Sequence, residues 1–361
     1  MAFTYRDVQE AYERIKPYIR RTPLEESYYL GGKIDGERDS ERGLEHALEP
    51  ADEHAPERAD EPADEHAPER DSERKYFFKL ESFQRAKSFK IRGAVNKLLT
   101  LTPEEIEKGI ATISSGNHGS SVSYAASMLG IKNAKIIVPE TTPQSKVDKI
   151  KYFGSDVLLM GRNYDEAHAL GMEYILTHDM TYIDAYYDDP KIYGGQGTIG
   201  IEILEQNPDI DTIVVPIGGG ALLTGIAVAV KAIKPGIRVI GVQTEACPAM
   251  IKSYEDGKIY EDYPCEESLC DSLIGGIGAL SYEMAKDYVD DFIAVSEETI
   301  GKAVSFMARQ EKFIVEAGSC TTVAAVMEQR ERIGGQNIAL VLSGGNIDGD
   351  VLFQLMEKYP E

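Results

Sequence analysis

One lysine and three loops rich in glycine, serine and asparagine are the features of this sequence that could carry chemistry. Lys90 lies in the stretch QRAKSFKIRGA (84–94), between Phe89 and Ile91 and shortly after an apolar run. A lysine amine becomes a nucleophile or a base when its surroundings lower its pKa. An isolated lysine on a helix is usually a solvated residue, so the role of Lys90 depends on what the loops supply.

The first loop contains three consecutive glycines, Gly218, Gly219 and Gly220, after the apolar run DTIVVP and before a helical pattern. Without Cβ atoms, consecutive amides can turn toward one anion, and the start of a helix adds its positive dipole end. The loop lacks the lysine of a nucleotide P-loop, and Leu223 stands where G-x-G-x-x-G needs its third glycine. It suits a small phosphate monoester better than a dinucleotide or ATP, although a tight turn would also explain the glycines.

The other two loops are polar. SSGNHGSS (114–121) offers hydroxyls, an amide and free N–H groups at a helix start, which suits a carboxylate as well as helix capping by Ser115 or Asn117. SGGNIDGD (343–350) places the Ser343 hydroxyl at a strand end, where it can meet a heteroatom or form a simple turn. A lysine, a phosphate loop, a carboxylate loop and a hydroxyl together fit one cofactor, pyridoxal 5'-phosphate (PLP).

The elements that must position these loops follow from the hydrophobic pattern. Apolar runs alternate with helical stretches, and they are continuous rather than alternating, which is typical of parallel strands buried on both faces. The predicted strands are 76–80, 110–114, 134–138, 156–160, 181–185, 211–216, 238–243, 291–296 and 337–343. Repeated strand–helix units predict a doubly wound α/β fold, in which ligands bind beyond the carboxyl ends of the strands.

Composition narrows the partners and the compartment. The chain has 361 residues, a formal net charge of −23 and no apolar run that could span a bilayer. Without a basic face, nucleic acid and anionic membranes are not expected partners. The start has no signal-peptide core. Cys247, Cys265, Cys270 and Cys320 show no C-x-x-C spacing, so we expect reduced thiols and a cytoplasmic protein.

Part of the acidity comes from a tandem repeat. ALEPADEHAPER at 47–58 is followed by ADEPADEHAPER at 59–70, with one difference. We interpret 43–74 as an acidic insertion in a flexible surface loop, because it has too few apolar residues to offset the entropy of ordering. The segment contains three of the six histidines, but their spacing in a polar run indicates a solvated loop, so we expect no metal site.

Five motifs in order, SFKIRGA, SSGNHG, GGQGTIGIE, VPIGGGALLTG and LSGGN, resemble the serine/threonine dehydratase family. These are PLP enzymes of the tryptophan-synthase-β-like fold (fold type II), and serine racemase belongs with them. The resemblance covers the chain except 43–74, and it is closest to the short catabolic threonine dehydratases and to serine racemase. It implies two doubly wound α/β domains with parallel-rich sheets, a large PLP-binding one (1–103 and 187–361) and a small one (104–186). It also implies a homo-oligomer, a dimer or a tetramer.

The resemblance gives cofactor roles to residues of all four segments. It implies that Lys90 forms the Schiff base and that Phe89 packs against the cofactor ring. It implies that Asn117 hydrogen-bonds the ring hydroxyl and that Ser343 faces the pyridine nitrogen. The phosphate would be held by successive backbone amides, those of Gly218, Gly219, Gly220, Ala221 and Leu222.

The same resemblance implies a reaction. The substrate carboxylate would lie among polar residues of one loop, Ser114, Ser115, Asn117 and His118. Glu316, in VEAGS, would approach the ring. A neutral serine opposite the ring nitrogen makes a weaker electron sink than a carboxylate would, which favours prompt loss of a β-leaving group. The expected activity is β-elimination of L-threonine or L-serine to a 2-oxo acid and ammonia, with Lys90 as general base.

Departures from the family pattern keep alternatives open. Ser115 stands where threonine dehydratases usually have alanine and serine racemases have a proton-donating serine, so it is a second candidate catalytic residue and racemisation stays a rival activity. Gln243 and Ala249 stand where the racemase divalent-metal site needs acids, so no metal is expected there. Tyr186 and Tyr187 are expected on the substrate side, where they could alter the size or polarity of the substrate. A 3-hydroxyaspartate dehydratase-like activity is a further alternative.

Overall fold

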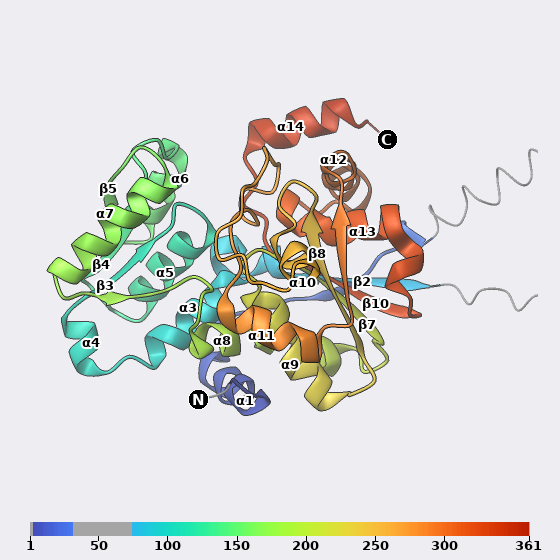
Figure 1. The fold of residues 1–361 in the computed structure, drawn as a ribbon, viewed down its shortest axis with the longest axis horizontal. Coiled ribbons are helices and arrows are strands. Elements are labelled where there is room, and N and C mark those ends of the chain that lie inside the picture. The colour runs from blue at the N-terminus through green and yellow to red at the C-terminus, as the bar shows by residue number, and fades with distance from the viewer. Residues whose placement is uncertain (1–2, 32–73, 361) are drawn as a thin grey trace, which may run out of the picture.

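The computed structural model describes residues 3–31 and 74–360, and the chain is built on two separate sheets. The predicted acidic insertion at 43–74 lies outside the described residues except for Arg74, and its loop character stays a prediction. In Figure 1 the smaller sheet, with α5, α6 and α7, lies on the left, and the larger sheet lies on the right. The parallel-rich α/β architecture predicted from the sequence is confirmed.

The larger sheet has six strands in the order β1-β2-β10-β7-β8-β9. Its strands are β1 (Leu24–Glu26), β2 (Lys75–Leu80), β7 (Thr212–Pro216), β8 (Arg238–Thr244), β9 (Asp291–Val295) and β10 (Asn337–Leu342). All neighbours pair in parallel except β1, which runs antiparallel to β2 at the edge. The carboxyl ends of β2, β10 and β7 therefore lie side by side.

The smaller sheet is entirely parallel, in the order β5-β4-β3-β6. Its strands are β3 (Ile110–Ile113), β4 (Ala134–Val138), β5 (Asp156–Leu159) and β6 (Thr181–Tyr182). These strands lie within the segment predicted as the small domain, 104–186, although the exact boundaries stay a prediction. Every strand predicted from the sequence is present, and β1 was missed.

Helices connect the strands and cover the sheets. They are α1 (Tyr5–Ile15), α3 (Lys90–Leu99), α4 (Pro103–Glu107), α5 (Asn117–Met128), α6 (Gln144–Tyr152), α7 (Tyr164–Thr177), α8 (Pro190–Gln206), α9 (Ala221–Ile233), α10 (Ala249–Glu255), α11 (Ala279–Tyr288), α12 (Glu297–Phe306), α13 (Ala317–Ile333) and α14 (Gly349–Lys358). No helix in the ranges 3–31 and 74–360 combines the length and apolarity needed to cross a bilayer.

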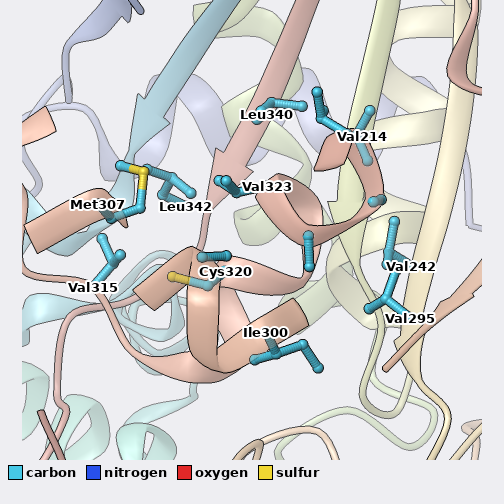
Figure 2. Close-up of a cluster of buried hydrophobic side chains, with 14 of the residues drawn as sticks. Val214, Val242, Val295, Ile300, Met307, Val315, Cys320, Val323, Leu340 and Leu342 are labelled. Atoms are coloured by element: carbon cyan, nitrogen blue, oxygen red, sulfur yellow. The ribbon is translucent and has the colours of Figure 1, made fainter. Parts of the chain in front are cut away.

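Both faces of the larger sheet are buried. On one face, Leu340 and Leu342 of β10 pack with α12 and α13 residues such as Ile300 and Val323, as Figure 2 shows. The intervening Val341 belongs to the cluster on the other face, with residues of α8 and α9. Successive side chains of a strand point to opposite faces, so a strand covered on both sides must be apolar throughout. This is why the strands read as continuous apolar runs.

The expectation that all cysteines are reduced is wrong for two of them. Cys247 and Cys265 form a disulfide with a Cα–Cα distance of 4.8 Å, whereas Cys270 and Cys320 are free and buried. Cys247 lies between β8 and α10, Cys265 follows α10, and the Gly275 N–H donates to both sulfurs. Sequence spacing missed the pair because the two residues are 18 apart and meet only through this return.

Candidate active site

The loops singled out in the sequence gather where the two sheets face each other. Lys90 is the first residue of α3, which follows β2, and the triglycine loop joins β7 to α9. Ser343 follows β10, so these three segments leave neighbouring strand ends of the larger sheet. The loop 114–116 leaves β3 of the smaller sheet and starts α5. Carboxyl ends of parallel strands form the usual ligand site of such folds.

The amine of Lys90 lies inside this site. Its Nζ donates to the carbonyl of Ala185 at 3.2 Å and lies 5.2 Å from the centroid of the Phe89 ring. Burial lowers the pKa of Lys90 to about 8, although the carboxylates of Asp184 and Glu316 oppose the shift. The unprotonated, nucleophilic form is therefore far more populated near neutral pH than in a free lysine.

This lowered pKa predicts how PLP attachment depends on pH. Only the neutral amine attacks an aldehyde, so the rate should rise roughly tenfold per pH unit below about pH 8 and level off above it. Rapid-mixing absorbance of the apoprotein with PLP measures this rate. A rate that keeps rising up to the ordinary lysine pKa of 10.5 would contradict the assigned environment, and Lys90→Ala is the blank.

Glu316 and Asn117 meet beside Lys90. The side-chain Nδ2 of Asn117 donates to both carboxylate oxygens of Glu316, at 2.8 and 3.0 Å, although the residues are 199 apart in sequence. The Oδ1 of Asn117 accepts from Nδ2 of Asn346 at 2.6 Å. Burial raises the pKa of Glu316 to about 6, while the bond from Asn117 pulls it the other way. The predicted ring-hydroxyl residue and the predicted ring-side acid are thus neighbours.

The triglycine loop has the conformation that bare backbone permits. Gly220 caps α9 with φ +96°, a left-handed conformation that favours glycine. A Cβ at Gly219 would lie 2.0 Å from a ring carbon of Tyr186, so only glycine fits against this ring. The first N–H groups of a helix have no intrahelical partner, so the start of α9 can donate to an anion. Tyr186 follows Ala185, which contacts Lys90, so the loop lies close to the lysine.

Ser343 is buried at the end of β10. Its Oγ lies 3.1 Å from Oγ of Ser319, and its carbonyl accepts from the N–H of Phe89 at 2.9 Å. The next residue, Gly344, forms an isolated bridge with Ser88. The end of β10 is thus attached directly to the turn that carries Lys90, which explains how residues far apart in sequence share one site.

The predicted substrate loop divides into an open part and a buried part. Ser114, Ser115 and Gly116 are partly exposed, and a Cβ at Gly116 would meet no described atom within 4 Å. His118 is buried, with Nε2 3.1 Å from the carbonyl of Ile183. Burial, and then the charge of Lys90, lower the pKa of His118 to about 4, so its ring is neutral at pH 7 and Nε2 carries the proton.

Three polar residues at the site were missed in the sequence. Asp184 accepts hydrogen bonds from the N–H groups of Tyr186 and Tyr187, at 2.6 and 2.7 Å, and acts electrostatically on Lys90. Asn346 ends the motif LSGGN, and its place after a strand was a usable signal. Lys149, on α6, reaches Asn346 from the smaller sheet. Nothing in the local sequence marks Asp184 or Lys149.

The segment that would hold the racemase-type metal has other contacts. Oε1 of Gln243 accepts from the N–H groups of Met250 and Ile251, at 2.9 and 3.2 Å. Cys247 is bonded to Cys265. Within the described ranges, no group of three or more His, Cys, Asp or Glu could hold a metal ion.

Comparison with known proteins agrees with this geometry. Residues 62–344 match the family described as "Pyridoxal-phosphate dependent enzyme". The chain is 39% identical over 283 residues to L-threonine ammonia-lyase of Thermotoga maritima, which covers 78% of this chain and 70% of that protein. It is 35% identical over 346 residues to catabolic L-threonine dehydratase of Staphylococcus aureus, covering 95% and 88%. The structure of maize serine racemase superposes with a TM-score of 0.82 at 31% identity, covering 100% of this chain and 98% of that one.

Proposed function

Because the chain belongs to the pyridoxal-phosphate dependent enzymes, we propose that it is a lyase that removes the β-hydroxyl of L-threonine or L-serine and yields a 2-oxo acid and ammonia. The observation that carries the proposal is the amine of Lys90, held at Ala185 with a pKa lowered to about 8. When bound, PLP supplies the electron sink that makes the Cα proton acidic.

The residues present suit this cofactor. Lys90 would take the aldehyde, and the N–H groups of 218–222 would hold the phosphate at the start of α9. Asn117 would donate to the ring hydroxyl, and the Ser343 hydroxyl would face the ring nitrogen. The proposal is supported by the donor set itself: a buried amine, glycine amides that no Cβ covers, an amide and a buried hydroxyl.

Proton transfer at Cα is assigned to Lys90. An amine with a pKa of about 8 can accept a proton near neutral pH and return it, which is the requirement for a general base. The carbonyl of Ala185 fixes the direction of the amine, and the carboxylate of Asp184 stabilises the ammonium that forms. The hydroxyls of Ser114 and Ser115 and the N–H groups at the start of α5 would bind the substrate carboxylate.

Serine racemisation is the second candidate. Ser115 is partly exposed beside the open space at Gly116, where a hydroxyl could deliver a proton to the face of Cα opposite Lys90. The structural similarity to maize serine racemase supports the same reading. Elimination is preferred because the curated relatives at 39% and 35% identity are named for threonine.

A substrate panel tests both candidates. Purified protein loaded with PLP is given L-threonine, L-serine and a 3-hydroxyaspartate, and 2-oxobutanoate, pyruvate, oxaloacetate and D-serine are measured by chromatography. We expect 2-oxobutanoate or pyruvate, with little D-serine. D-serine as the main product from L-serine would favour the racemase, and no turnover of either L-threonine or L-serine would refute the proposed substrate class.

We further propose that the enzyme acts in the cytoplasm as a homodimer or homotetramer. Exposed apolar side chains at Tyr28, Phe83 and Ile314 support a face covered by another copy. Light scattering of the purified protein measures the assembly, and a monomer at all concentrations would contradict it.

A further inference from the structure

A chain of hydrogen bonds crosses between the two sheets at the site. Lys149 of α6, on the smaller sheet, donates to Oδ1 of Asn346, in the loop after β10. Asn346 donates to Oδ1 of Asn117 at 2.6 Å and to the carbonyl of Ala86 at 3.0 Å. Asn117 donates in turn to the carboxylate of Glu316. The chain thus begins at an ammonium group and ends at a carboxylate.

The two ends fix the direction of every bond between them. An ammonium can only donate, so the oxygen of the Asn346 amide must face Lys149. The NH₂ group of Asn346 then faces Asn117 and the carbonyl of Ala86, and this carbonyl can only accept. Asn117 must therefore offer its oxygen to Asn346 and its NH₂ group to Glu316. A flip of either amide would place donor against donor or acceptor against acceptor.

We propose that Lys149 and Asn346 are positioning residues that hold the NH₂ group of Asn117 toward the ring hydroxyl of PLP while α6 rests against the β10 loop. The inference depends on the proposed role of Asn117. An NH₂ group has two hydrogens, so one can remain on Glu316 while the other meets the cofactor oxygen. In the flipped amide, the Asn117 oxygen would face an anionic ring oxygen and repel it.

Glu316 is buried and Lys149 is half-buried, which strengthens this control over the amide direction. Burial lowers the pKa of Lys149, and the carboxylate of Glu316 opposes that shift. The charges at the two ends attract each other through a site with little water, where electrostatic interactions weaken less than at the surface. The arrangement forms only when the smaller sheet's α6 contacts the loop after β10, so amide direction and contact between the two sheets are coupled.

The same helix offers a matched control. Lys146 lies one turn before Lys149 and also reaches across, with Nζ 3.2 Å from a carboxylate oxygen of Asp271. It makes the same kind of cross-sheet contact but donates to no member of the chain from Asn346 to Glu316. If the α6 lysines only held the two sheets together, removal of either one should have the same effect on bound PLP. The proposal predicts an effect for Lys149 and none for Lys146.

The test is the pH titration of the visible band of the PLP-loaded protein without substrate. An N–H donor on the ring oxygen weakens the oxygen's hold on the neighbouring imine proton, so losing the donor should raise the pKa of the band. We expect Lys149→Met and Asn346→Leu to raise it by about one pH unit, a tenfold change in the equilibrium. Lys149→Arg should keep the pKa of the band close to the wild-type value, because arginine can also donate to Asn346. Lys146→Met should leave that pKa unchanged.

The outcomes separate this inference from the proposed function. If Asn117→Ala shifts the band but Lys149→Met and Asn346→Leu do not, the inference is wrong and the proposed function stands. An equal shift in Lys146→Met, or none in Asn117→Ala, would also overturn it. If the wild-type protein forms no visible band with PLP, the proposed function itself fails.

Discussion

Replacement of Lys90 by alanine should eliminate the visible band of bound PLP and lower kcat/KM by at least about 10⁴-fold, the upper range for losing a general base. The variant loses both the amine that attaches the cofactor and the base that takes the Cα proton. Added PLP should still bind through the triglycine loop but should remain removable by dialysis. Absorbance and 2-oxo acid formation, measured on the same preparation, report the two losses separately.

Lys97→Met is the control for this variant. Lys97 lies two turns further along α3, and its Nζ is 2.7 Å from a carboxylate oxygen of Asp189, the residue that caps α8. This variant should retain the band and the activity. If Lys90→Ala kept a band that borohydride fixes to the protein, another amine would be the attachment point. Lys149 would be the first candidate, because burial lowers its pKa as well.

Most strands could be predicted because they are buried on both faces of a sheet. Those at 211–216 and 337–343 were recognised as continuous apolar runs, and the structure buries β7 completely and β10 almost completely. β1 escaped prediction because it has only three residues, one half-buried and two exposed, and so short an edge strand carries no periodic signal. The triglycine loop at 218–220 and the loop at 114–121 could be singled out because ligand sites in this fold class follow strand ends, and glycine, serine and asparagine mark such turns.

Residues placed by packing between the sheets could not be predicted. Lys149 lies on an ordinary amphipathic helix, and only the approach of α6 to the β10 loop brings it to Asn346. Tyr186 was predicted on the substrate side, and the contact of its ring with Gly219 of the triglycine loop was not predicted. The partners of Glu316 and Cys247 also come from distant segments, and a single sequence contains no record of such contacts.

Arg92 shows that the motif around Lys90 has a second, structural role. Arg92 is fully buried, and its guanidinium donates to Glu81 at 2.8 Å and to Glu202 at 2.7 Å. The buried ammonium of Lys79 also donates to Glu202 at 2.7 Å. Two cations and two carboxylates thus balance in the interior. Burial favours loss of the Arg92 proton, but the two carboxylates outweigh this and raise the pKa of Arg92. This network connects the segment that follows β2 and the start of α3 to α8.

Replacement of Arg92 by methionine should therefore lower the free energy of unfolding by about 3–5 kcal/mol at pH 7, the cost of leaving buried carboxylates without their partner. Urea unfolding at fixed PLP concentration measures it, with Arg6→Ala as the control, because the exposed Arg6–Glu10 pair should contribute only about 0.3–0.5 kcal/mol. In the variant, the folded-state pKa of Glu202 should rise, because burial raises it and the Arg92 charge that lowers it is gone. Protonation of Glu202 then favours folding, so the deficit relative to wild type should shrink as the pH falls toward 5. A loss below about 1 kcal/mol, or a deficit that grows on acidification, would show that the carboxylates do not depend on Arg92.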